Sequence, residues 1–171
     1  MALDTRKRFT RLWRHWRCGT GDIKRYFGAN GFAQIEVAIA MGEVSHNAEV
    51  RFAVEASLDA YQIWAQVSPR QRARTHFSGL RVWDTEANNG VLIYLLLGDR
   101  SVEIVVDREA ERRISPHVWA SACATMSAAF LRAEYTQGVL RALDIIQPSL
   151  VNAFPLQASD RNELSNEVGV L

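Results

Sequence analysis

Oxygen-bearing side chains are concentrated near one apolar segment of the chain, Val91 to Leu97. Carboxylates and amides of this kind are the ligands that hard divalent cations prefer in proteins. The sequence therefore predicts a binding site for Ca²⁺ or Mg²⁺, with no catalytic residue assigned beside it. The predicted metal ligands precede this segment, follow its hairpin partner or end the first core helix: Glu43, Asp84, Asn88, Asn89 and Asp107.

A second interpretation of these residues stays open. Asn88, Asn89 and Gly90 have the composition of a turn, and the nearby acids are equally suited to cap helices or to face solvent. The D-x-D-x-D-G spacing of an EF-hand calcium loop is absent from the sequence. Tight calcium binding of that type is therefore not predicted.

Two apolar segments predict the hairpin that positions these side chains. Val91 to Leu97 is an unbroken apolar run, which is typical of a strand buried on both faces. Gly98-Asp99 is a turn signal that leads into a returning strand over residues 102–106, so Asp99 is predicted to be a turn residue. Residues 84–89 and Asp107 then lie together at the opposite end of the sheet.

The rest of the chain predicts an α/β domain. The expected elements are a helix over 31–45, a strand over 49–56, a helical stretch over 58–80 broken at Pro69, and three helices after residue 107. This order is typical of a three-layer α/β/α sandwich with a small mixed β-sheet. The strand over 49–56 should run parallel to the strand over 91–97 through a right-handed helical crossover, and the hairpin strand should run antiparallel.

Composition divides the chain into three parts. Residues 1–30 form a basic amphipathic helical arm, residues 31–155 form the α/β domain, and residues 156–171 form a polar C-terminal tail that we expect to be loosely held. The arm contains eight Lys or Arg residues and two acids, whereas the remainder contains twelve and seventeen. This separation of charge suggests that the arm docks on the body or on an acidic partner.

Within the arm, residues 4–17 predict a short amphipathic helix whose apolar face includes Phe9 and Leu12. In one interpretation it docks on an anionic membrane surface or on an unknown protein partner. In the other, its tryptophans cover an apolar patch of the same domain. The residues predicted to make the docking contact are Arg11, Trp13 and Trp16. Nucleic-acid binding is not expected, because the body of the protein is net negative.

Composition and motifs exclude most other classes. The longest apolar run has seven residues, far short of the roughly 20 that cross a bilayer. We therefore expect a cytoplasmic location, which includes a peripheral position on the inner face of the membrane. Cys18 and Cys123 are predicted to be free thiols. Phosphatase cysteine loops, histidine metal motifs, nucleophile elbows and Walker loops are absent. Metal-bound water at the acidic end of the sheet is the enzymatic route that remains.

Several short segments, in this order and spacing, resemble the TPM domain family. They are residues 43–50 (EVSHNAEV), 89–94 (NGVLIY), 98–100 (GDR), 102–107 (VEIVVD), Trp119, 130–138 (FLRAEYTQG) and Phe154-Pro155. The resemblance covers roughly residues 30–155 and is strongest to the short bacterial branch that lacks a signal peptide and a membrane anchor. It implies a three-layer α/β/α fold.

The resemblance leaves three functions open. Some members of the family bind divalent cations, calcium among them, and others act as accessory or regulatory proteins in membranes. Acid phosphatase activity has been attributed to the plant lumenal member. The resemblance therefore implies an intracellular binding or regulatory module that holds a divalent cation. The alternatives are a metal-dependent, acid-phosphatase-like hydrolase and a peripheral membrane or partner-docking accessory protein.

Overall fold

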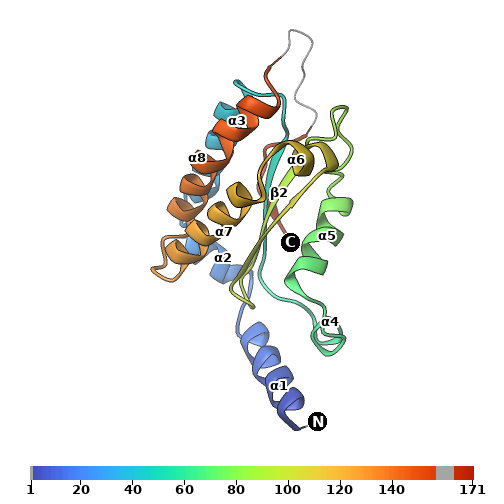
Figure 1. The fold of residues 1–171 in the computed structure, drawn as a ribbon. Helices are drawn as coiled ribbons and strands as arrows, with labels where there is room; N and C mark the ends of the chain where they lie inside the picture. The colour runs from blue at the N-terminus through green and yellow to red at the C-terminus, as the bar shows by residue number, and fades with distance from the viewer. Residues whose placement is uncertain (1, 157–163) are drawn as a thin grey trace.

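The computed structural model describes residues 2–156 and 164–171, which form one mixed sheet between two layers of helices (Figure 1). The elements are α1 (Ala2–Trp16), α2 (Thr20–Phe27), α3 (Gly31–Glu43), β1 (Val50–Glu55), α4 (Ala60–Trp64), α5 (Pro69–Gly79), β2 (Val91–Leu96), β3 (Ser101–Val106), α6 (Arg108–Arg113), α7 (Pro116–Phe130), α8 (Tyr135–Ala153) and β4 (Gly169–Val170). The predicted α/β/α architecture is confirmed.

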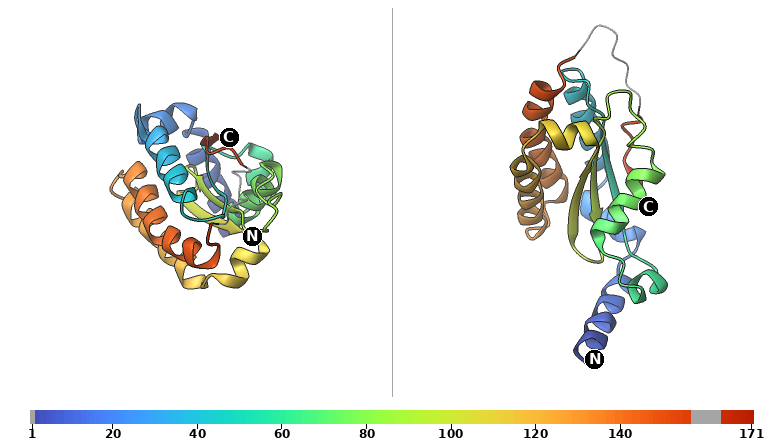
Figure 2. Two further views of the ribbon diagram at one scale, coloured as in Figure 1. Left: turned by 90° about the horizontal axis from the view of Figure 1, so that it is seen from above. Right: turned by 45° about the vertical axis from the view of Figure 1, so that its right-hand side comes forward.

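The sheet has the strand order β3-β2-β1-β4. As predicted, β1 runs parallel to β2 and β3 runs antiparallel to it, with Val91 opposite both Val50 and Val106. Helices α2, α3, α7 and α8 cover one face, and α4 and α5 cover the other (Figure 2). This register places the start of β2 and the end of β3 at one end of the sheet, and the hairpin turn at the other.

Strand β2 is apolar throughout because both of its faces are covered. All six of its residues are buried. Val91, Ile93 and Leu95 belong to the core beneath α3, α7 and α8, whereas Leu92 and Tyr94 belong to the core beneath α4 and α5. Because both faces of this strand are buried, its residues do not alternate between apolar and polar. The sequence accordingly shows an unbroken apolar run.

The helical stretch after β1 is divided in two at Pro69, where the sequence predicts a break. Ser68 caps α5: its Oγ accepts a hydrogen bond from the Gln71 amide at 3.2 Å, and the Gln71 Oε1 accepts one from the Ser68 amide at 2.8 Å. This reciprocal capping box fixes the start of the helix, while Pro69 occupies a first-turn position that needs no amide donor. The stretch therefore forms α4 and α5.

The C-terminal tail is held more firmly than predicted. Gly169–Val170 pairs with β1 as β4, and the Leu171 amide donates to the Val54 carbonyl at 3.0 Å. Glu36 Oε1 also accepts a hydrogen bond from the Val168 amide at 2.9 Å. A two-residue strand has too short a pattern to detect in sequence. Residues 157–163 of the predicted tail lie outside the described residues.

Candidate functional site

Helix α1 extends from one end of the body and exposes its aromatic residues (Figure 1). Phe9, Trp13 and Trp16 have exposed fractions of 57%, 56% and 76%, and the Phe9 ring meets the half-exposed Trp64 of α4 edge-on at 6.0 Å. These four residues are called the aromatic face below. The interpretation that the tryptophans cover an apolar patch of the domain does not hold, because both rings are more than half exposed, whereas Leu12 of α1 packs against the core.

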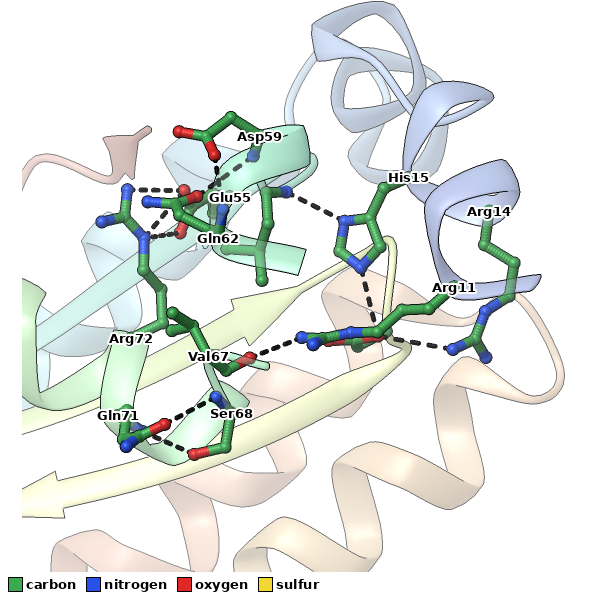
Figure 3. A network of polar contacts seen from close by, with 12 residues as sticks. Arg11, Arg14, His15, Glu55, Asp59, Gln62, Val67, Ser68, Gln71 and Arg72 are labelled. Carbon is green, nitrogen blue, oxygen red and sulfur yellow. Dashed lines mark hydrogen bonds and ion pairs between the residues drawn. The ribbon is translucent and has the colours of Figure 1, made fainter. Parts of the chain in front are cut away.

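A carboxylate at the hairpin turn fastens α1 to the body. Asp99 Oδ2 accepts a hydrogen bond from Arg11 Nη2 at 2.6 Å, and its Oδ1 lies 3.1 Å from His15 Nε2. His15 Nδ1 accepts a hydrogen bond from the Leu58 amide at 2.9 Å, so its Nε2 carries the proton that faces Asp99. Figure 3 shows Arg11, Arg14 and His15 reaching from α1 towards this contact. We call Asp99, Arg11 and His15 the polar anchor.

The polar anchor corrects two expectations. Asp99 lies at the hairpin turn as predicted, but it also binds α1. Burial alone would raise the pKa of Asp99, yet hydrogen bonds from His15 and Arg11 outweigh burial and lower it. Arg11, predicted to contact a membrane or partner, has a side chain only 18% exposed and also donates to the Val67 carbonyl. Sequence periodicity could not reveal a contact across 88 residues.

Basic side chains border the aromatic face. Arg6, Lys7, Arg14 and Arg17 are exposed on α1 and the residue after it. The Arg17 guanidinium lies 5.7 Å from the centre of the Trp13 ring, and the Arg8 guanidinium lies 5.8 Å from that of Trp64. Such contacts keep cations and indole rings together at the surface. The exposed side of α1 therefore combines apolar rings with positive charge.

Three of the five predicted metal ligands have other roles. Glu43 Oε1 accepts a hydrogen bond from the Val50 amide at 3.1 Å. Asp84 forms an exposed ion pair with Arg81 at 2.7 Å. Asn88 occupies a left-handed turn conformation, with φ of 50°. Among residues 2–156 and 164–171, no three His, Cys, Asp or Glu side chains are grouped as a metal site would require.

Glu43 is nevertheless electrostatically unusual. Burial raises its pKa to about 7, and the negative charge of Glu49 adds to the increase, while hydrogen bonds from Val50 and Asn166 oppose it. The Glu49 Oε2 in turn accepts a hydrogen bond from the Leu164 amide at 3.2 Å. These two carboxylates hold the C-terminal tail against the start of β1.

The other two predicted ligands have buried oxygen atoms without donors. Asp107 caps α6, with its Oδ1 accepting from the Arg108 amide at 2.7 Å, and its amide donates to the Gly90 carbonyl at 2.8 Å. Asn89 is 1% exposed, and its amide group donates to the Asn47 carbonyl. Within the described part of the chain, no group donates to Asp107 Oδ2 or Asn89 Oδ1. Buried acceptors of this kind are normally satisfied.

A buried ion-pair network was missed in the sequence. Glu55, at the end of β1, accepts a hydrogen bond from Arg72 Nη2 at 2.7 Å (Figure 3). It also accepts one from the Tyr94 hydroxyl, and His76 Nε2 lies 3.0 Å from its Oε2. Burial would raise the pKa of Glu55, but hydrogen bonds from His76, Arg72 and Tyr94 lower it to about 2. Every carboxylate oxygen is therefore satisfied, and the network ties α5 to the sheet. No spacing motif links these four residues.

Comparisons with known proteins agree with this fold. Residues 22–148 match the family described as TPM domain. The NMR structure of BA42 protein from the psychrophilic bacterium Bizionia argentinensis is similar in fold, with a TM-score of 0.74 and 24% sequence identity over 84% of this chain and 94% of that chain. No curated protein matches the chain. Helix α1 lies before residues 22–148, the part of the chain that matches the family.

Proposed function

The chain belongs to the TPM domain family, and from that premise we propose that it is a non-catalytic accessory module that docks on an anionic membrane surface through α1. The aromatic face carries this proposal, because Trp16 is 76% exposed on a helix that precedes the residues matched by the family. None of the described helices is long and apolar enough to cross a bilayer, so docking would be peripheral.

Positive charge and exposed indole rings favour a lipid surface over a protein groove. The aromatic face is bordered by exposed arginines and a lysine, which suit the negative surface of a cytoplasmic leaflet at about 1 kcal/mol per basic residue. Indole rings prefer the headgroup level of a bilayer. Because the polar anchor holds α1 from its opposite side, the helix can lie on a membrane without leaving the body.

We expect the full-length protein to sediment with vesicles that contain phosphatidylserine but not with vesicles of phosphatidylcholine alone. Replacing Trp13 and Trp16 with alanine should weaken binding at least about tenfold, since burying only ~60 Å² of indole surface corresponds to that factor. Replacing the half-exposed Trp83, which is distant from α1 in sequence, with alanine is the matched control and should leave binding unchanged. Equal sedimentation of the double variant would contradict docking through this face, and binding to neither vesicle would favour a protein partner.

A second candidate function is the binding of a divalent cation at the end of the sheet. The buried Asp107 Oδ2 and Asn89 Oδ1 support it, since an acceptor without a donor costs about 1–3 kcal/mol and a cation would satisfy both. Asp107 lies opposite Gly90, the neighbour of Asn89. Two protein ligands suit weak binding of calcium or magnesium, with water completing the coordination.

For this candidate we expect millimolar calcium or magnesium to raise the melting temperature. Ligand at ten times its Kd contributes about 1.4 kcal/mol, or about 4 °C for a chain of this size. The substitution Asp107→Asn should abolish the increase, whereas Asp84→Asn should retain it because Asp84 is paired with Arg81. An increase that survives Asp107→Asn would place the cation elsewhere. Assaying the same samples with a phosphomonoester and a chelator would separate binding from metal-dependent hydrolysis.

A further inference from the structure

A cavity of about 370 Å³ lies between α1, α2 and the hairpin turn, and its wall is rich in arginine. Arg14 and Arg17 come from the end of α1 and the residue after it, Arg25 comes from α2, and Arg100 follows the turn. The single acid on the wall is Asp22, whose Oδ2 already accepts a hydrogen bond from the Gly19 amide at 3.0 Å. Four positive charges and one negative charge therefore line the same cavity.

The guanidinium groups are positioned rather than dispersed in solvent. Arg25 lies over Tyr26, 5.3 Å from the ring centre, and Arg17 lies over Trp13, and both rings are part of the wall. Arg14 contacts Asp99 at 3.4 Å, through a side chain that is 47% exposed. Among the described residues, no carboxylate forms an ion pair with Arg17, Arg25 or Arg100. These charges are available to an outside anion.

A second cavity, of about 250 Å³, adjoins the first, and most of its wall residues have apolar or aromatic side chains. The two share Tyr26, Leu97 and Arg100 on their walls. Phe130 and Tyr135 line the second cavity, with their rings stacked at 4.7 Å, and Tyr135 stacks on Tyr26 at 4.4 Å. A ligand that bridges the two cavities would place its charge among arginines and its apolar part beside aromatic rings.

We infer that this pair of cavities binds a phosphate monoester that carries an apolar group. Guanidinium forks match tetrahedral phosphate oxygens, and several can donate to one dianion. The apolar cavity favours an esterified phosphate, because the ester can place its apolar group there and inorganic phosphate cannot. A soluble aryl phosphate and the headgroup of phosphatidic acid share this chemistry. The inference does not depend on membrane docking, since Arg25 and Arg100 lie outside α1.

The test uses isothermal titration of the full-length protein at constant ionic strength with phenyl phosphate and inorganic phosphate. We expect phenyl phosphate to bind more tightly than inorganic phosphate. Changing both Arg25 and Arg100 to glutamine should weaken the binding of phenyl phosphate at least about tenfold. The exposed Arg74 of α5 provides the matched control, and Arg74→Gln should leave the affinity unchanged.

A separate substitution tests the role of the apolar cavity. Leu131 is 84% exposed and lines this cavity, so Leu131→Gln should reduce the preference for phenyl phosphate without changing the affinity for inorganic phosphate. Vesicles of phosphatidic acid and of phosphatidylserine, compared at equal charge, distinguish a lipid source of the phosphate from a soluble one. Absence of phenyl phosphate binding, or binding that the Arg25 and Arg100 changes leave intact, would overturn the inference.

Discussion

Replacing Glu55 with glutamine is expected to lower the free energy of unfolding by about 3 kcal/mol, because it leaves the positive charge of Arg72 beside a neutral amide. The Glu55 side chain is 5% exposed and that of Arg72 is 21% exposed, so solvent screens the pair only in part. Removing one partner of a buried ion pair lowers the free energy of unfolding by more than the intact pair contributes to it. Urea denaturation followed by circular dichroism measures the change.

The same network predicts how stability depends on pH. Its hydrogen bonds lower the pKa of Glu55 in the folded protein to about 2, from an ordinary 4.5. The folded state therefore gains stability from this group above the ordinary pKa and loses it as pH falls from about 4.5 towards 2. The difference in unfolding free energy between the wild type and Glu55→Gln should be constant above about pH 5 and shrink below it.

An exposed ion pair provides the control. Asp84 and Arg81 interact at 2.7 Å, but their side chains are 44% and 73% exposed. Asp84→Asn, measured without divalent cations, should change the unfolding free energy by less than about 1 kcal/mol. A Glu55→Gln effect no larger than this would show that the network contributes little to stability.

Replacing Asp99 with asparagine is expected to release α1 from the body and to cost about 2 kcal/mol. The substitution keeps the shape of the side chain but removes the charge that Arg11 and His15 share. Hydrogen bonds to charged groups contribute roughly 1.5–3 kcal/mol each, and the Asp99 side chain is only 9% exposed. Since its folded pKa is lowered, this contribution is present above the ordinary pKa of the carboxyl group and lost below it.

Hydrogen exchange at one amide reports on this release. The Leu58 amide donates to His15 Nδ1 at 2.9 Å, so it is protected only while α1 is docked. Asp99→Asn should accelerate its exchange while amides of β2 remain protected. Arg14→Gln is the control, because Arg14 approaches Asp99 only to 3.4 Å. Unchanged protection of Leu58 in Asp99→Asn would show that the apolar contact of Leu12 holds the helix without the polar anchor.

Local patterns were enough to predict three of the four strands of the sheet. The unbroken apolar run that became β2 and the Gly98-Asp99 turn predicted the antiparallel hairpin. The break predicted at Pro69 marks the start of α5. Each of these features depends on neighbours within a few residues, which a single sequence contains.

Contacts between distant segments could not be predicted in the same way. The partners of Glu55 lie between 17 and 39 residues away, and Arg11 lies 88 residues from Asp99. Nothing in the spacing of these residues identifies the pairs. The same limit applies to β4, where two residues complete an edge of the sheet only because the tail returns to β1.

The most direct test of membrane docking follows the fluorescence of Trp16 alone. A variant with Trp13, Trp64, Trp83 and Trp119 changed to phenylalanine retains this one indole. With phosphatidylserine vesicles, we expect its emission to shift to shorter wavelength and to be quenched by lipids brominated near the headgroup end of their acyl chains. Emission that stays at the wavelength of an indole in water, without quenching at saturating lipid, would contradict docking through α1.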